Sequence, residues 1–161
     1  MWGNEMDYTY KRVTVFHPLR VLRTARILHR CGKDMAKKYD LHHWDNSWIK
    51  TLAVVLLTAC KGKTYLVTLD QPVATFTYKQ SGDTLYFEKL ATLPECAGQG
   101  IGGHCMAEIE RIAKEKGCRS VSMDVYDRSE HAKQFYLHKG YVFCGEIKTR
   151  KYVGCKMKKD I

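Results

Sequence analysis

The first part of the chain carries apolar residues at helical spacing. After Pro18, whose missing N–H suits the first turn of a helix, apolar residues recur at Leu19, Leu22, Ala25 and Leu28. We expect this helix to end at Gly32, a common break signal. Residues 33–48 are irregular, and a second helix is expected from a cap at Asn46 or Ser47 to about Cys60.

From Lys63 onward the apolar residues follow strand patterns instead. Runs rich in β-branched and aromatic residues alternate with turn-forming residues, and they cover residues 64–69, 73–79 and 84–93. The short turns between them predict an antiparallel meander of three strands. A similar run at residues 11–16 predicts one more strand before the first helix.

A glycine-rich stretch joins this meander to an amphipathic helix. Residues 94–103 read Pro-Glu-Cys-Ala-Gly-Gln-Gly-Ile-Gly-Gly, and the helix expected over residues 101–116 has one apolar face formed by Ile101, Cys105, Ile109 and Ile112. Glycines before a helix turn the chain sharply and leave backbone N–H groups bare, which suits an anion such as a pyrophosphate. A strand-to-helix turn without a ligand has the same pattern, so the glycines alone leave both interpretations open.

The C-terminal third predicts strands around one short helix. The expected elements are a strand over residues 120–126, a helix over 130–139 capped by Asp127 or Ser129, and a terminal hairpin of residues 141–147 and 151–157. Because a helix connects strand 84–93 to strand 120–126, the two are expected to be parallel neighbours. Without a repeat, a low-complexity tract or a linker, the pattern predicts a single domain over residues 1–161.

The composition is ordinary for a soluble globular protein, with 45% hydrophobic and 27% charged residues. The longest apolar run, residues 52–57, is far shorter than the roughly 20 residues that span a bilayer, so we expect no membrane partner. The seven cysteines are an odd number without a Cys-x-x-Cys pair. This predicts reduced thiols and no metal site, and it favours a cytoplasmic protein.

The formal net charge of +10 fits a nucleic-acid surface, an anionic small ligand, or solubility alone. The basic residues are spread from Lys11 to Lys159 rather than gathered in one tract. Because no RNA-reading aromatic motif accompanies the charge, nucleic acid is the less favoured partner.

Two blocks of residues stand out as motifs, with a strand expected between them. The first is Ala97-Gly98-Gln99-Gly100-Ile101-Gly102, and the second is residues 129–141, which read Ser-Glu-His-Ala-Lys-Gln-Phe-Tyr-Leu-His-Lys-Gly-Tyr. Together they resemble the GNAT superfamily of acetyl-CoA-dependent N-acyltransferases, whose blocks are Arg/Gln-x-x-Gly-x-Gly/Ala and Asn-x-x-Ala-x-x-x-Tyr-x-x-x-Gly-Phe. The resemblance covers residues 63–157 well, whereas the first sixty residues carry no signature.

The resemblance implies a fold and a co-substrate. The fold is of the α/β class (an α+β mixed sheet), with a mostly antiparallel sheet of about seven strands, the fourth and fifth parallel and splayed, and about four flanking helices. In the family, the pantetheine arm of CoA lies between the splayed strands and the glycine loop holds the pyrophosphate. The implied CoA-binding residues are Leu90, Ala91, Thr92, Ala97, Gly98, Gln99, Gly100, Ile101, Gly102, Gly103, Ser129 and Tyr136.

Two of these positions depart from the family pattern. Ala97 stands where Arg or Gln is usual, which removes a side chain but spares the backbone amides that bind phosphate. Ser129 stands where Asn commonly contacts the pantetheine arm, and serine donates and accepts over a shorter reach. We expect both departures to tune CoA affinity rather than abolish it.

The implied reaction is acetyl transfer from acetyl-CoA to a primary amine by direct attack in a ternary complex. Tyr136 matches the family's usual general acid, and a phenol with a pKa of about 10 is protonated at neutral pH; packing with Phe135 is the alternative role. Asp124 and Glu88 are the candidate general bases, and a water chain is a third route. For either acid, a solvated or ion-paired side chain is the alternative.

Two other function classes stay open: a CoA-binding or sensing module without catalysis, and a basic nucleic-acid-binding protein. The acceptor amine, on a small molecule or a peptide, is not identified by the sequence. The candidates to line its side are His42, His43, Trp44 and Tyr152. Family members are often dimers, so a homodimer is one possible assembly, and nothing in this sequence decides between a monomer and a dimer.

Overall fold

A computed structural model describes residues 7–61, 63–150 and 152–161. A single sheet of seven strands runs through it in the order β1-β2-β3-β4-β5-β7-β6. The strands are β1 (Thr9–Val13), β2 (Lys63–Thr68), β3 (Pro72–Ser81), β4 (Thr84–Thr92), β5 (Ser120–Tyr126), β6 (Val142–Lys148) and β7 (Val153–Asp160). All neighbours are antiparallel except β4 and β5, which are parallel, as the crossover through a helix predicted.

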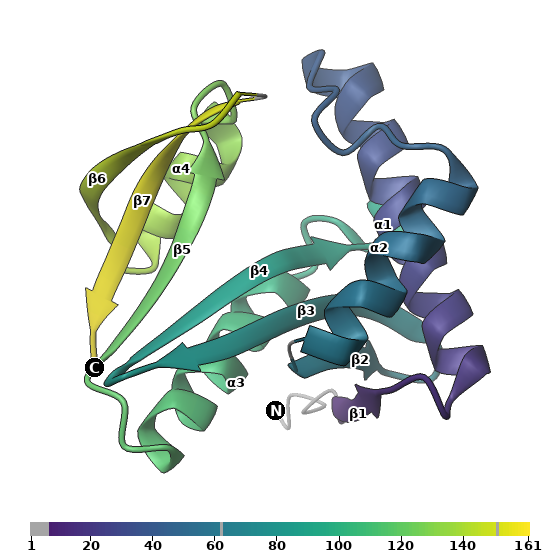
Figure 1. Cartoon of the computed structure of the whole chain (residues 1–161), viewed down its shortest axis with the longest axis horizontal. Coiled ribbons are helices and arrows are strands. Elements are labelled where there is room, and N and C mark those ends of the chain that lie inside the picture. The colour runs from purple at the N-terminus through teal and green to yellow at the C-terminus, as the bar shows by residue number, and fades with distance from the viewer. Residues whose placement is uncertain (1–6, 62, 151) are drawn as a thin grey trace, which may run out of the picture.

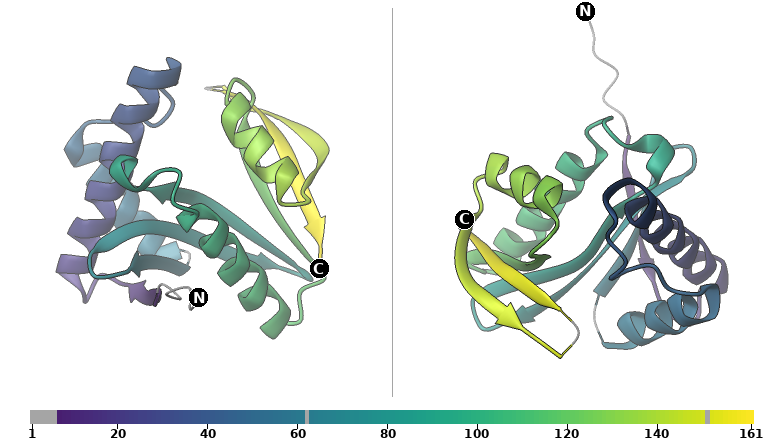
Figure 2. Two further views of the ribbon diagram at one scale, coloured as in Figure 1. Left: turned by 180° about the vertical axis from the view of Figure 1, so that it is seen from behind. Right: turned by 90° about the horizontal axis from the view of Figure 1, so that it is seen from above.

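Helices cover both faces of this sheet (Figures 1 and 2). They are α1 (Pro18–Tyr39), α2 (Trp48–Lys61), α3 (Ile101–Glu115) and α4 (Glu130–His138), with a short 3-10 helix, η1 (Pro94–Cys96), after β4. The helices α1 and α2 lie on one face, while α3 and α4 lie on the other. The mixed α/β fold expected from the sequence is therefore confirmed.

Each face of the sheet has its own apolar core. On one face, the stripe of α3 that includes Ile101, Cys105 and Ile109 packs on Phe76 and Phe87 of the sheet. On the other face, a smaller cluster joins α1 and α2 to the sheet; its members are Val13, Val21, Ala25, Ile27, Leu28, Val55, Leu66 and Ala91. Burial of these apolar surfaces is the main force that holds the helices in place.

The strands β4 and β5 pair over a short distance and then diverge. Their parallel pairing runs only from Thr84↔Ser120 to Tyr86↔Ser122, although β4 continues to Thr92 and β5 to Tyr126. Figure 1 shows the resulting V between the teal β4 and the green β5. The inner edges of both strands beyond the pairing are free to bind a ligand.

A bulge in β4 changes which side chains face each core. Lys89 has a left-handed backbone with φ of 52°, and the register with β3 shifts between Thr75 and Thr77. Before the bulge, Phe87 belongs to the core beneath α3; after it, Ala91 belongs to the core beneath α1 and α2. The extra residue therefore reverses the alternation of the strand, as β-bulges do.

The first helix is longer than the sequence analysis predicted. Gly32 does not end it; the helix continues to Tyr39, where Asp40 adopts the left-handed cap with φ of 55°. Gly32 is buried because the loop after the helix crosses it closely, and a Cβ at this position would lie 2.8 Å from the carbonyl carbon of Trp44. The glycine thus serves a close approach of two segments.

The other element predictions need only small corrections. The first strand covers Thr9–Val13 rather than residues 11–16, and the last hairpin strand runs to Asp160. Ser47 immediately precedes the second helix, and its Oγ accepts a hydrogen bond from the Lys50 amide at 3.3 Å. Gly117, with φ of 70°, follows the end of α3 as predicted.

Candidate active site

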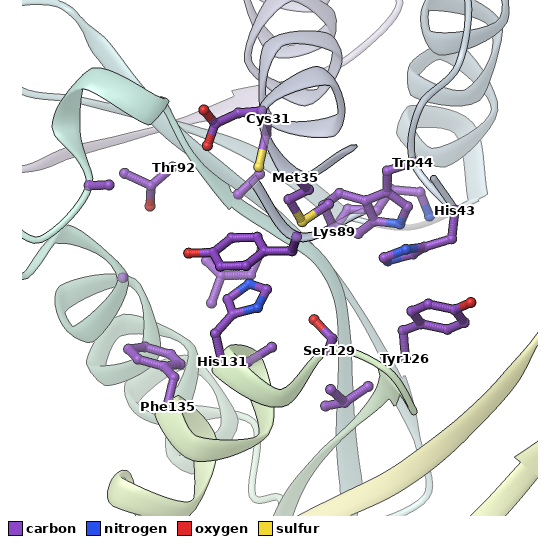
Figure 3. A pocket seen from close by; sticks show the side chains of 18 of the residues that line it. Cys31, Met35, His43, Trp44, Lys89, Thr92, Tyr126, Ser129, His131 and Phe135 are labelled. Carbon is purple, nitrogen blue, oxygen red and sulfur yellow. The ribbon is translucent and has the colours of Figure 1, made fainter. Parts of the chain in front are cut away.

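A cavity of about 1000 Å³ occupies the V between β4 and β5. Its walls come from the end of α1, the loop before α2, the diverging halves of β4 and β5, the glycine loop and α4. Figure 3 shows side chains from these segments converging on it. The elements named separately by the sequence therefore meet at one place.

The glycine loop lies at one end of this cavity. Gly98 and Gly100 have left-handed backbones, with φ of 76° and 79°, and a Cβ at either position would meet no atom within 4 Å. Gly100 is the N-cap of α3 and has no side chain to occupy the free N–H groups of the first turn. The loop thus presents bare amides at a helix N-terminus, the geometry that binds phosphate groups.

Two further glycines allow α3 and α4 to approach each other. A Cβ at Gly102 would lie 3.3 Å from the ring of Phe135, and one at Gly103 would lie 2.9 Å from Lys139 Nζ. Both glycines, with Ala97 and Ile101, line the cavity. The side chain of Gln99 is outside the cavity lining and its Nε2 donates to the Glu95 carbonyl at 3.4 Å.

The expected strand contacts of CoA also face the cavity. Leu90, Ala91 and Thr92 all line it, just after the bulge at Lys89. Ala91 and Thr92 pair with β3 on one edge of β4, so the opposite edge is the one that faces the gap. An extended chain of a ligand would find backbone groups there, as an added strand does.

Tyr136 projects from α4 toward the same cavity. Its ring packs against Phe87 and Tyr141, with centroids 6.0 Å and 6.1 Å away. Within the described part of the chain, its hydroxyl has no hydrogen-bond partner. Burial raises the pKa of the Tyr136 phenol, so the group stays protonated at neutral pH and is able to donate.

Ser129 sits immediately before α4 as its N-cap. The residue is 4% exposed, and its side chain makes no capping hydrogen bond. It lines the cavity, and Figure 3 shows its hydroxyl directed into it. The hydroxyl is therefore available for a ligand, at the place where the family pattern has Asn.

The two candidate bases line the cavity together. Tyr86 pairs with Ser122 across the parallel strands, and Asp124 lies two residues further along β5. The Tyr86 hydroxyl donates to Asp124 Oδ2 at 2.8 Å. The Glu88 carboxylate instead forms an ion pair with Lys89, whose Nζ lies 2.9 Å from Glu88 Oε1. Burial, and then the hydrogen bond to Asp124, raise the pKa of Tyr86, so this phenol remains the donor.

The loop between α1 and α2 reaches across the mouth of the V. The ring centroids of His43 and Tyr126 are 4.3 Å apart, and those of the stacked Tyr39 and His131 are 4.1 Å apart. Figure 3 shows the His43 and Tyr126 rings next to each other. Arg128 Nη2 lies 3.9 Å from Asp40 Oδ2, so an ion pair also joins the two sides. Burial lowers the pKa of both His43 and His131, so both imidazoles are neutral at pH 7.

Sequence reasoning named part of this wall and missed the rest. His42, His43, Trp44 and Tyr152 all line the cavity, as the candidates for the acceptor side. Tyr86, Tyr126 and His131 were not singled out as site residues. One signal could have found Tyr86. It lies two residues before Glu88 on a strand, so alternation places the two side chains on the same face of the sheet.

Three further features concern the cysteines, metal ligands and membrane-spanning helices. All seven cysteines are free thiols. In the described ranges, no three His, Cys, Asp or Glu side chains are grouped so that they would hold a metal ion. Of the helices described, none combines the length and the apolar character needed to cross a membrane.

Comparison with known proteins agrees with this arrangement. Residues 24–141 match the acetyltransferase (GNAT) family. A bovine (Bos taurus) protein described as thialysine N-epsilon-acetyltransferase is 33% identical over 55 residues, which are 34% of this chain and about a third (32%) of that protein.

Solved structures share the fold over nearly the whole chain. A GCN5-related N-acetyltransferase structure from Rhodopseudomonas palustris has a TM-score of 0.74 at 16% identity, covering 99% of this chain and 100% of that one. PaiA N-acetyltransferase of Thermoplasma acidophilum, solved with coenzyme A, has a TM-score of 0.70 at 16% identity, covering 97% and 100%. The family match over most of the sequence, joined to this fold, shows that the chain belongs to the GNAT acetyltransferase family.

Proposed function

We propose that this protein is an N-acetyltransferase that transfers the acetyl group of acetyl-CoA to a primary amine by direct attack in a ternary complex. One observation carries the proposal: the glycine loop, Tyr136 and the two carboxylates line a single cavity between β4 and β5. A phosphate-binding loop alone would suit many ligands. A proton donor and a proton acceptor in the same cavity are what acyl transfer to an amine requires.

The residues present fit a CoA molecule. The bare amides after Gly98 and the N-terminus of α3 suit the pyrophosphate, and the free edge of β4 near Leu90 suits the amides of the pantetheine arm. The uncapped hydroxyl of Ser129 adds a donor and acceptor on the opposite wall. When bound, acetyl-CoA supplies the thioester carbonyl carbon to which the amine nitrogen forms its new bond.

Tyr136 is proposed as the general acid. The carbon–sulfur bond breaks as the carbon–nitrogen bond forms, and the departing sulfur takes the phenolic proton of Tyr136. The hydroxyl has no other partner in the described residues, and its raised pKa keeps the proton in place until the sulfur leaves. Its contact with Phe87 holds the ring at the wall of the cavity.

The general base accepts the proton that the amine loses. Asp124 and Glu88 are both candidates, because both line the cavity. The Glu88 carboxylate is already paired with Lys89, whereas the one partner of Asp124 among the described residues is the neutral phenol of Tyr86. We therefore propose Asp124, directly or through a water molecule, as the first choice.

The test is release of free CoA thiol. The protein is mixed with acetyl-CoA and a panel of small amines and amino-terminal peptides, and thiol is followed with time. We expect release that depends on one class of amine. Tight CoA binding without release from any amine would overturn the proposed activity in favour of a CoA-binding module.

A further inference from the structure

The outer face of α2 carries the larger apolar side chains of this helix. Its buried residues, which face the sheet, are Thr51, Val55 and Ala59. Because an α-helix has about 3.6 residues per turn, the opposite side is formed by a second stripe, all of it exposed: Ile49, Ala53, Leu56, Leu57 and Cys60. A helix that is apolar on all sides is typical of a buried position, so this outer stripe is the face that a partner would cover.

The turn before α1 and the first turns of that helix add to this surface. Phe16 is 87% exposed and Leu19 is 65% exposed, and Val15 and Leu22 are exposed as well. The helices α1 and α2 contact each other and both contact the sheet, and Figure 2 shows them on the same side of it. Their outer faces therefore lie next to each other. We call these four residues and the outer stripe of α2 the α1–α2 apolar surface; a group of exposed apolar side chains of this kind marks an interaction site.

The charge around the α1–α2 apolar surface has one sign. Residues 8–33 and 46–69 contain Lys and Arg but no Asp or Glu. On α1, Arg23 and Arg26 are exposed and form no ion pair with another described residue, and the same holds for Lys61 at the end of α2. The surface thus combines apolar side chains with positive charge that no ion pair balances.

We propose that the α1–α2 apolar surface docks on a membrane of anionic phospholipid as a peripheral contact. Anionic headgroups neutralise Arg23, Arg26 and Lys61, and apolar side chains such as Phe16 enter the boundary between headgroups and acyl chains. This surface is separate from the cavity between β4 and β5, because none of its residues lines that cavity. The proposal therefore does not depend on the proposed acetyl transfer.

The charge and the shape of the surface favour a membrane over two other occupants. A second copy of this chain would bring the same cations to the interface, and like charges placed opposite each other weaken association. A peptide helix or strand is bound in a groove, but these residues line neither the large cavity nor the small one beside Trp44 and Thr51. A peripheral contact needs no spanning helix, so the short apolar runs that led us to expect no membrane partner do not exclude it.

The experiment measures partition of the protein onto vesicles by co-sedimentation. The vesicles consist of phosphatidylcholine alone or of phosphatidylcholine with about 30 mol% phosphatidylserine, and we expect the partition coefficient to be at least about tenfold larger for the anionic vesicles. The difference should shrink as the ionic strength is raised, because salt screens the attraction between the cations and the headgroups. Equal partition of the wild-type protein onto the two kinds of vesicle would overturn the proposal.

A matched pair of variants locates the contact. The double variant Phe16→Ser, Leu57→Ser removes two exposed apolar side chains from the surface, and we expect it to partition about tenfold or more weakly onto the anionic vesicles. The control is Val142→Ser, Phe143→Ser on β6, which removes equally exposed apolar side chains at the other edge of the sheet and should partition like the wild type. Unchanged CoA affinity and thermal melting show that both variants are folded. Equal losses in the two variants, or no loss in the first, would contradict the assignment.

Two further measurements separate the membrane from the other occupants. In Arg23→Gln, Arg26→Gln the preference for anionic vesicles should fall about tenfold, since each cation near such a surface contributes to binding; a preference that survives would overturn the proposal. Light scattering gives the oligomeric state. If the wild type is a dimer that does not bind vesicles, and Phe16→Ser, Leu57→Ser makes it a monomer, the surface belongs to a second copy and the membrane proposal is wrong.

Discussion

The two ends of the cavity are built in different ways. At the α3 end, the ligand-facing groups are backbone amides, and the residues that matter are glycines that remove side chains or adopt left-handed backbones. At the α1 end, the ligand-facing groups are side chains: carboxylates, phenols and imidazoles from segments far apart in the sequence. The α3 end therefore depends on the backbone conformation of one short segment, whereas the α1 end depends on individual side chains from several segments.

The difference matches the two ligands of the proposed function, CoA and an amine. A phosphate group is recognised by N–H groups arranged around a helix N-terminus, and this arrangement is a local property of a short segment. Selection among amines depends on charge and on the rings around it, and these can be supplied from any neighbouring segment. Substitutions at the two ends should therefore have separable effects, on CoA affinity at one end and on turnover or acceptor choice at the other.

The largest effect is expected where the two ends meet, at Tyr136. In Tyr136→Phe the ring still packs on Phe87 and Tyr141, but the proton donor is lost. We expect kcat to fall by about 10²-fold or more, the usual size of a general-acid contribution, while the Kd of CoA changes by less than about threefold. Thiol release and calorimetric titration measure the two quantities. Equal losses in both, or unchanged turnover, would assign Tyr136 to packing.

Within the glycine loop, backbone shape should matter more than side chains. Gly100 has φ of 79°, so Gly100→Val places a β-branched residue in the left-handed region at a cost of about 1–2 kcal/mol. The free loop can relax away from this shape, and CoA binding must then restore it, so we expect a loss of CoA affinity of up to roughly 5- to 30-fold. Ala97 has an extended backbone with φ of −62°, and its side chain is exposed.

For Ala97→Arg we therefore expect a CoA affinity within about threefold of wild type, because any residue adopts this backbone. Calorimetric titration of CoA with both variants makes the comparison. Similar effects of the two substitutions would show that the loop does not act through its backbone.

At the α1 end of the cavity, two histidines predict a dependence of stability on pH: His43, which is half-buried, and His131, which is exposed but stacked on Tyr39. Burial lowers the pKa of His43 and His131 in the folded protein below the value of about 6.5 expected in the unfolded chain. The unfolded state then binds more protons at acidic pH, so the free energy of unfolding falls as the pH drops below about 6.5.

The measurement is the melting temperature at pH 7.5 and pH 5.5. We expect it to drop on acidification, and the drop to be smaller in the double variant His43→Gln, His131→Gln. His42 titrates in the opposite sense, because the hydrogen bonds that its ring donates to the Asp40 and Asp45 carboxylates raise its pKa. This residue is present in both proteins, so its contribution cancels in the comparison. An identical drop in wild type and variant would contradict the assignment.

The smallest effect is expected from an exposed contact between the two ends. Arg30 on α1 pairs with Glu95 on η1 at 2.6 Å, and the two side chains are 40% and 50% exposed. Exposed ion pairs contribute about 0–1 kcal/mol, so Arg30→Ala should lower the free energy of unfolding by less than about 1 kcal/mol and leave CoA affinity unchanged. Urea unfolding measures the first quantity. A larger loss would mean that this pair positions the glycine loop.

Most of the fold was predictable from the sequence because its signals are local. The apolar stripe from Ile101 to Ile112 and the stop at Gly117 define α3 without reference to the rest of the chain. The failure at Gly32 has an equally clear cause. Its close neighbour is Trp44, which lies in a separate loop, and no local pattern distinguishes a glycine that ends a helix from one that admits another segment.

The sequence by itself determined the glycine loop, the helix that carries Tyr136 and the parallel placement of β4 and β5. These follow from local propensity, hydrophobic period and the handedness of crossover connections, all of which are written in short stretches of chain. The glycine loop and the helix that carries Tyr136 hold the two motif blocks, and these blocks are sufficient to indicate the family.

Only the tertiary structure decided which side chains line the cavity. The bulge at Lys89 reverses the alternation of β4 midway, and the divergence of β4 from β5 after Tyr86 opens the space between them. Charge balance also depends on neighbours from distant segments: Asp45 forms an ion pair with Lys33, whereas Asp124 has, within residues 7–61, 63–150 and 152–161, the Tyr86 hydroxyl as its partner. Pairwise distances of this kind arise from packing, which is why Asp124 and Glu88 were equal in the sequence and differ in the fold.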